Sequence, residues 1–193
     1  MHVEFEVLSK LDKTATPEFL LTLKPQWVEA VGADFGSLSH AHQKSPARAN
    51  SGDDWLTWLI LGGHGSGKTR AGAEWVRQVA QNDPHARIAQ IAETEHEARE
   101  VMVEGVSGLL AVHPSDQRPE WFPSRRRLEW KNGAVAQIFS AEKCEALRGP
   151  QFSAAWLDEL AKWRQEDKNA AINGWRSPRE PLDAFASFAG FES

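Results

Sequence analysis

Cysteine, tyrosine and long apolar runs are scarce or missing in this chain of 193 residues. Its one cysteine, Cys144, excludes an internal disulfide and a zinc site built from several cysteines. No apolar run approaches the roughly 20 residues that cross a bilayer as a helix. The first residues, Met1–Glu6, lack the basic and then apolar pattern of a signal peptide. We therefore expect a cytoplasmic protein that makes no membrane contact.

Basic charge is also in short supply. The chain has 22 Lys and Arg against 27 Asp and Glu, which gives a formal net charge of −5. That balance excludes a nucleic-acid-binding surface that is basic throughout. The one dense basic cluster is Arg125-Arg126-Arg127. It could contact phosphates, but such a cluster is more often a solvated turn before a strand, and we favour that interpretation.

Apolar residues are plentiful enough for one domain with a real core. Hydrophobic residues make up 41% of the chain and charged residues 25%, as in ordinary globular proteins. Residues 17–31 have the spacing of a short amphipathic helix. Residues 32–54 are polar and rich in Ser, Ala and Gly, which predicts a loose linker. We expect the organised part of the chain to begin near Trp55.

An apolar stretch that runs into a glycine-rich loop is the most informative feature. Residues 55–61 are apolar and aromatic, as in a buried strand. Gly62, Gly67, Lys68 and Thr69 then fit the phosphate-binding pattern G-x-x-x-x-G-K-[ST]. Inward-pointing amides of such a loop form a nest for phosphates, the lysine neutralises their charge, and the threonine hydroxyl binds Mg²⁺. The loop predicts a nucleoside triphosphate site that includes Gly62, Gly63, His64, Gly65, Ser66, Gly67, Lys68 and Thr69.

Helices and strands are expected to alternate after the loop. Residues 70–81 predict a helix and residues 87–92 a second strand. Thr94 and Glu97 have the spacing of a capping box at the start of the next helix. The alternative is a metal site formed by the acidic residues and the histidine of this stretch, Glu93, Glu95, His96 and Glu97. We favour capping because it explains the same residues at lower cost.

The second half of the core contains a hairpin and a further strand. Residues 127–130 and 134–140 flank Asn132-Gly133, a strong hairpin signal. Residues 154–157 form an apolar run that ends in Asp158-Glu159. The alternation of helices and strands, with the glycine loop after the first strong strand, predicts a P-loop NTPase. This is a three-layer α/β sandwich with a mainly parallel sheet.

Asp158-Glu159 supplies what a phosphate-loop ATPase needs next. A carboxylate at a strand end near the loop can hold Mg²⁺, and an adjacent carboxylate can polarise the attacking water. Alone, such a pair often only caps a helix. In combination with the glycine loop, we favour the catalytic interpretation.

Five segments resemble the ATPase domain of phage terminase large subunits, the motors that package DNA into proheads. The resemblance is closest to the branch found in tailed phages, prophages and gene transfer agents of α-proteobacteria. The segments are residues 58–63, 65–77, 98–105, 147–152 and 155–160.

The resemblance implies ATP hydrolysis that drives viral DNA into a prohead. It implies ATP and Mg²⁺ as ligands, Lys68 and Glu159 as catalytic residues, and Thr69 and Asp158 on the metal. Arg148 falls in a loop that the family keeps near the nucleotide. The implied partners are double-stranded DNA, a portal protein and a terminase small subunit, with a homo-oligomeric ring in the cytoplasm of a bacterial host.

Two departures from the family pattern matter. His64 stands where the family loop usually has an arginine that contacts the γ-phosphate. If that arginine stabilises the transition state, hydrolysis should be slower by several orders of magnitude. The resemblance also ends near Trp163, and the run Ala184–Ala189 is too weak to predict the family's next strand.

We therefore expect three parts: an N-terminal helix and polar linker (1–54), a P-loop ATPase core (55–163), and a divergent tail (164–193). The sheet would be incomplete at its C-terminal side and no nuclease domain is expected, as in a truncated terminase. One alternative is an inactive remnant that binds nucleotide weakly. Another is a small P-loop kinase, against which the Leu-Asp-Glu strand end and the lack of a lid or acceptor segment argue.

Overall fold

The computed structural model describes residues 34–148, 151–169 and 183–189. The chain divides into two compact units, residues 1–39 and residues 40–193. Of the first unit, the structure describes α4 (Phe35–Leu38). The helix predicted for residues 17–31 lies outside the described residues. In the described part of the chain, no helix is long and apolar enough to span a membrane.

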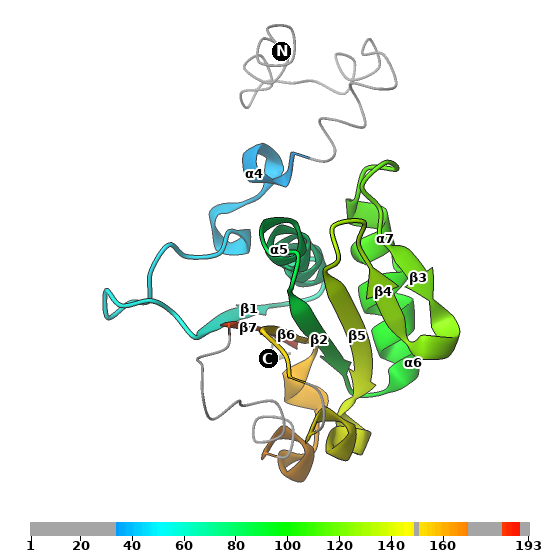
Figure 1. The fold of residues 1–193 in the computed structure, drawn as a ribbon. Helices are drawn as coiled ribbons and strands as arrows, with labels where there is room; N and C mark the ends of the chain where they lie inside the picture. Colours follow the sequence, from blue (N-terminus) through cyan, green and yellow to red (C-terminus); the bar gives the residue numbers. More distant parts are fainter. Residues whose placement is uncertain (1–33, 149–150, 170–182, 190–193) are drawn as a thin grey trace, which may run out of the picture. The chain divides into compact units, whose positions relative to one another are not determined.

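A seven-stranded sheet forms the centre of the second unit, with the strand order β1-β7-β6-β2-β5-β4-β3 (Figure 1). The strands β1, β7, β6, β2 and β5 run parallel, whereas β4 and β3 are antiparallel. The mainly parallel α/β sheet confirms the predicted fold class. The strand bounds are β1 Thr57–Gly62, β2 Arg87–Ala92, β3 Glu120–Phe122, β4 Arg127–Glu129, β5 Val135–Ser140, β6 Ala154–Leu157 and β7 Asp183–Ala189.

The strand β7 corrects one prediction. The run Ala184–Ala189 was expected to be too weak for a strand, yet β7 lies between β1 and β6 and pairs with both. The prediction that this run forms no strand of the sheet is therefore wrong. Both neighbours offer backbone hydrogen bonds, and such tertiary context overrides the low strand propensity of an alanine-rich segment.

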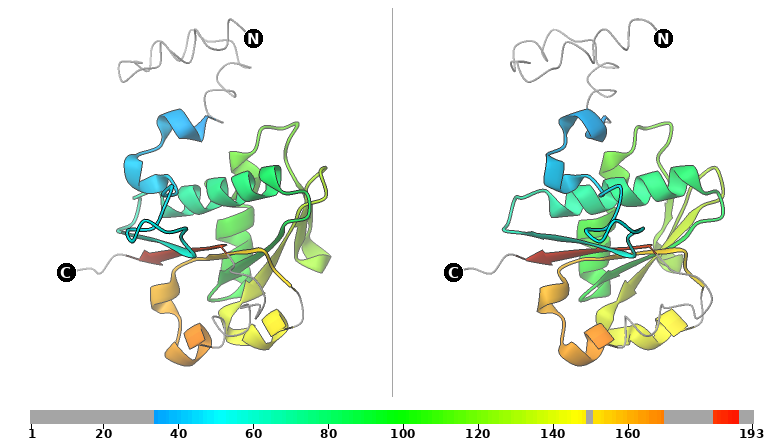
Figure 2. Two further views of the ribbon diagram at one scale, coloured as in Figure 1. Left: turned by 60° about the vertical axis from the view of Figure 1, so that its left-hand side comes forward. Right: turned by 90° about the vertical axis from the view of Figure 1, so that its left-hand side faces the viewer.

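Helices cover both faces of the sheet (Figure 2). The long helix α5 (Lys68–Asn82) lies on one face, where the Trp156 indole fills the space that a Cβ at Gly72 would occupy. On the opposite face, strand residues Ile91 and Leu157 join a buried cluster with Leu147, Phe152 and Trp163. This cluster is covered by η4 (Ala141–Arg148) and η5 (Leu160–Lys162). A short helix at 165–169 follows η5. The result is the predicted three-layer sandwich.

The segment after β2 begins with the predicted capping box. The backbone N–H of Glu97 donates to the Thr94 hydroxyl, and the Glu97 carboxylate accepts from the Thr94 backbone. Among the described residues, no group of three or more His, Cys, Asp or Glu side chains is arranged to hold a metal ion. The short helix α6 (Glu95–Glu97) continues into a π-helix, η2 (Ala98–Val103), and then α7 (Leu109–Val112).

The predicted hairpin is also present. Strands β4 and β5 pair in antiparallel register, and the turn between them contains Gly133 at a φ of 105°. The cluster Arg125–Arg127 begins with the last residue of the turn η3 (Pro123–Arg125) and ends with the first residue of β4.

Candidate nucleotide-binding site

The glycine loop connects the end of β1 to the start of α5, in the order that the sequence predicts. Gly65 and Gly67 have φ angles of 76° and 80°, a left-handed conformation that favours glycine. Gly67 is the N-cap of α5, so the loop leads directly into the positive end of a 15-residue helix. Such a terminus stabilises a bound anion.

Lys68 is buried and directed back into its own loop. Its Nζ donates to the carbonyl oxygens of Gly62 (2.8 Å) and Gly63 (3.1 Å). The same Nζ lies 4.0 Å from Oε1 of Glu159. The side chain of Lys68 therefore connects the loop after β1 with the end of β6.

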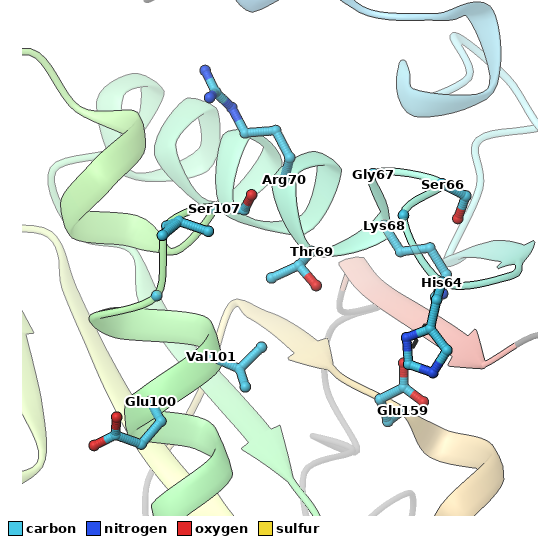
Figure 3. Close-up of a pocket in the computed structure, with 13 residues that line it drawn as sticks. His64, Ser66, Gly67, Lys68, Thr69, Arg70, Glu100, Val101, Ser107 and Glu159 are labelled. Carbon is cyan, nitrogen blue, oxygen red and sulfur yellow. Dashed lines mark ion pairs between the residues drawn. The ribbon is translucent and has the colours of Figure 1, made fainter.

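Glu159 reaches the loop because of an unusual backbone conformation. It has a φ of 51° two residues after the end of β6, a left-handed conformation that is costly for a residue with a side chain. Its Oε2 lies 3.9 Å from Nζ of Lys162. The carboxylate is thus flanked by two lysines, one from the loop and one from η5. Figure 3 shows the loop residues and Glu159 around the same space.

Asp158 is held by its backbone and is 5% exposed. Its N–H donates to the Ile91 carbonyl oxygen in the neighbouring strand, and its own carbonyl accepts from the Trp163 indole (3.1 Å). The backbone of Asp158 is therefore held by β2 through its N–H and by Trp163, which follows η5, through its carbonyl.

A pocket of about 490 Å³ lies between the loop and the Glu159 corner. The pocket brings together seven predicted site residues, whereas Gly62, Gly63 and Asp158 do not line it. The side chain of Arg148 lies outside the described residues. The lining residues are His64, Gly65, Ser66, Gly67, Lys68, Thr69, Arg70, Glu100, Val101, Gly105, Val106, Ser107 and Glu159.

The sequence did not predict that residues before Trp55 would support the loop. Gln43, in the turn η1 (Ala41–Gln43), donates from Nε2 to the Gly67 carbonyl (3.3 Å), and His42 Nε2 lies 3.1 Å from the Ser66 carbonyl oxygen. A Cβ at Gly67 would collide with Gln43. The predicted linker 32–54 is therefore too broad, because His42 and Gln43 contact the loop. Nothing in a polar stretch of sequence indicates such a contact.

The second group that the sequence did not predict is a set of pocket-lining residues in η2 and in the loop before α7. They are Glu100, Val101, Gly105, Val106 and Ser107. Glu100 and Val101 come from η2, and Val106 is 96% exposed in the loop that follows. The π-helical form of η2 is typical of functional sites, but no local sequence pattern predicts a π-helix.

The fold and the pocket define a P-loop NTPase in which β7 separates the loop strand β1 from the acidic strand β6. A family model described as "Terminase large subunit, T4likevirus-type, N-terminal" matches residues 59–181, more than half of the chain. The chain belongs to this family of terminase large subunits. The match continues past Trp163 to residue 181, so the prediction that the resemblance ends near Trp163 is wrong. No curated protein matches the chain in sequence.

Solved structures that the chain resembles in fold include phage packaging proteins. The large terminase of the thermophilic bacteriophage D6E is 11% identical with a TM-score of 0.58, over 83% of this chain and 38% of that one. The ATPase domain of the Thermus phage P74-26 large terminase is 18% identical with a TM-score of 0.53, over 92% and 70% of the two chains.

The N-terminal domain of the DNA packaging ATPase of bacteriophage phi29 is 15% identical with a TM-score of 0.53, over 70% and 74%. At these identities the similarity shows the fold, and the fold is that of terminase ATPase domains. The chain spans little more than a third of the length of the D6E terminase.

Proposed function

We propose that this chain binds Mg-ATP in the P-loop pocket and hydrolyses it to drive double-stranded DNA into a prohead. The observation that carries the proposal is the position of Glu159, whose carboxylate lies 4.0 Å from the P-loop lysine across the pocket. A P-loop with a carboxylate at this position has both parts needed for attack of water on a γ-phosphate.

Nucleotide binding is supported by the dimensions and chemistry of the pocket. Its volume of about 490 Å³ is in the range of small-ligand sites. Lys68 now donates to two loop carbonyls, and these bonds are exchanged for phosphate oxygens when a triphosphate enters. The large terminase of phage D6E has been solved with ATP-gamma-S and with ADP.

The chain also offers suitable ligands for Mg²⁺. The Thr69 hydroxyl and the Asp158 carboxylate are hard oxygen donors, the type that Mg²⁺ prefers. We propose that these two residues hold the ion. When bound, Mg²⁺ neutralises the charge that develops on the phosphates during transfer.

Glu159 acts in this proposal as the base that orients and polarises the attacking water. Once Lys68 moves to the phosphates, Lys162 at 3.9 Å remains beside the carboxylate and holds it toward the pocket. Arg148 is proposed to contact the nucleotide because of the resemblance of its loop, residues 147–152.

The partners follow from family membership. We propose that the chain acts on double-stranded DNA in a bacterial host cytoplasm, with a portal protein, a terminase small subunit and further copies arranged in a ring. The match to a terminase family and the packaging ATPase of phi29 support this proposal.

Phosphate release from Mg-ATP, with and without duplex DNA, tests the function. We expect turnover by the wild-type chain, and loss of both ATP binding and turnover in Lys68→Ala. Equal turnover in wild type and Lys68→Ala would contradict the site. ATP binding without turnover would favour the inactive remnant, and faster transfer to a small acceptor than to water would favour a kinase.

A further inference from the structure

We propose that a second, basic pocket binds a phosphate of the double-stranded DNA backbone. Arg125 and Arg126 from the η3–β4 turn, Lys143 from η4 and Glu95 from α6 supply its charged groups. This assignment rests on the proposed function, because that function makes duplex DNA the partner.

The basic pocket is the right size for a single phosphate group. Its volume is about 180 Å³, well below the roughly 300 Å³ at which sites for small molecules begin. Residues 137–140 of β5 also line it, and the Ser140 hydroxyl donates to the Glu93 carbonyl and accepts from the Glu142 N–H. The pocket is therefore too small for a nucleoside but open to a phosphodiester that presents its oxygens from outside.

Its charges are unbalanced in the direction that phosphate requires. Oε1 of Glu95 lies 2.7 Å from Arg126 and 3.6 Å from Lys143, so one carboxylate serves two cations. The Arg125 guanidinium is placed over the Phe122 ring, 5.8 Å from its centroid. Three cations face one anion here, although the whole chain carries a net charge of −5.

The backbone at Arg126 supports a role for its side chain. Arg126 has a φ of 54°, one of only two non-glycine residues with positive φ in the described part of the chain, and the other is Glu159. Glycine or asparagine would adopt this conformation at lower cost. The turn is fixed by the Arg126 N–H on the Pro123 carbonyl and by the Ile138 N–H on the Arg126 carbonyl. Backbone strain of this kind is found at functional sites, and we infer that here it directs the Arg126 guanidinium toward the basic pocket.

The position of the basic pocket relates it to the ATP site. Strands β2 and β5 run parallel, so Glu95 and Lys143, which follow them, lie at the carboxyl edge of the sheet. The P-loop and Glu159 follow β1 and β6 at that same edge. In Figure 1, α6 lies beside the end of β5, and its continuation η2 supplies Glu100 and Val101 to the P-loop pocket.

Exposure favours a polymer outside the surface over a small buried anion. The side chains of Arg126 and Lys143 are 54% and 69% exposed, whereas Glu95 is 27% exposed. The cations can therefore turn outward to a passing phosphate, while Glu95 remains behind as the group that the phosphate displaces. Arginine and lysine contacts to phosphates of this kind position a duplex without reading its sequence.

Duplex binding by the full chain, followed by fluorescence anisotropy over a series of salt concentrations, tests the proposal. We expect Arg126→Ala to weaken binding about tenfold and to lower the slope of log affinity against log salt by about one. Glu95→Gln should tighten binding severalfold, because it removes the competing carboxylate. A merely structural Glu95 would produce the opposite sign.

The matched control is Lys131→Ala, which removes the same charge at the far end of the same hairpin, where Lys131 donates to the Asp116 carbonyl. Equal loss in Lys131→Ala and Arg126→Ala, no tightening in Glu95→Gln, or no duplex binding by wild type would overturn the proposal. Binding of inorganic phosphate that depends on Arg126, without duplex binding, would assign the pocket to a free anion instead. ATP affinity and turnover of Arg126→Ala, measured separately, show whether the ATPase proposal stands or fails independently.

Discussion

His64 is the residue of the glycine loop that departs from the family pattern. It lines the P-loop pocket at the position where the family loop usually has an arginine. A neutral imidazole lacks the permanent charge and forked donors of a guanidinium. The pocket thus combines the P-loop with the carboxylate of Glu159, but its loop carries less permanent positive charge than the family pattern supplies.

We predict that His64→Arg raises ATP turnover at least about tenfold, because arginines at transferred phosphates contribute large factors to the rate. Steady-state phosphate release measures the effect. His85→Arg, which places the same change at an exposed histidine outside the pocket, should leave turnover unchanged. An unaltered or lower rate in His64→Arg would mean that this position does not face the developing charge.

Trp163 acts at the residue scale as a positioning group. Its indole N–H donates to the Asp158 carbonyl, and both residues are buried. Trp163→Phe keeps an aromatic ring but leaves that carbonyl without its indole donor. We predict a loss of about 1–2 kcal/mol in the free energy of unfolding. We also predict a several-fold lower kcat with an unchanged KM for ATP.

Denaturant titration and steady-state kinetics check both effects. Trp121→Phe is the control, because it removes an indole hydrogen bond to Glu104 outside the P-loop pocket. A KM that rises with no change in kcat would argue against a role in fixing the acidic corner.

How well the site could be predicted differs from residue to residue. Lys68, Thr69 and Glu159 were predicted because local patterns identify them, and the structure brings all three to one pocket. Gln43 was missed because its contact with Gly67 spans 24 residues and no local pattern encodes it. The catalytic roles of these residues remain predictions until they are tested.

At the scale of elements, β5 and β7 show the limits of local sequence. The β4–β5 hairpin was predicted because Asn132-Gly133 specifies its turn within a few residues. The strand β7 was not, because its formation depends on β1 and β6, which flank it in space and lie far away in sequence. Long-range pairing of this kind leaves almost no trace in composition.

The contact between α7 and β4 contains a buried histidine that makes folding sensitive to acid. Trp130 Nε1 donates to His113 Nε2 (2.9 Å), so the His113 proton is on Nδ1, which donates to the Leu109 carbonyl (2.6 Å). Burial, helped by the charges of Arg77 and Arg118 and opposed by the hydrogen bond to the Leu109 carbonyl, lowers the pKa of His113 to about 4. The folded protein therefore favours the neutral form of the His113 imidazole.

We predict a loss of stability as pH falls from about 6.5 to 4. Above this window the imidazole is neutral in both states and its contribution is complete. Within the window His113 is protonated in the unfolded chain but not in the folded chain. This difference lowers the free energy of unfolding by about 3 kcal/mol across the window. Urea unfolding at several pH values measures the slope, and His113→Gln should flatten it. Identical slopes in the two proteins would contradict the assignment.

At the scale of the whole molecule, the fold places two charged pockets at one edge of one sheet. The P-loop pocket lies at the ends of β1 and β6, and the basic pocket lies at the ends of β2 and β5. In parallel sheets, ligands bind at the carboxyl ends of the strands, and both pockets follow that rule. An ATPase that moves DNA needs a nucleotide site and a polymer contact, and under our two proposals both would lie on this one sheet.

The most direct test of the central claim separates ATP binding from ATP hydrolysis in Glu159→Gln. Glutamine keeps the size of the side chain and removes the base. We predict the same affinity for Mg-ATP by calorimetry as in the wild-type chain, and phosphate release at least about 100-fold slower, the usual contribution of a general base. Equal rates of phosphate release in the two proteins, at equal ATP affinity, would contradict the assignment of Glu159 and with it this account of the site.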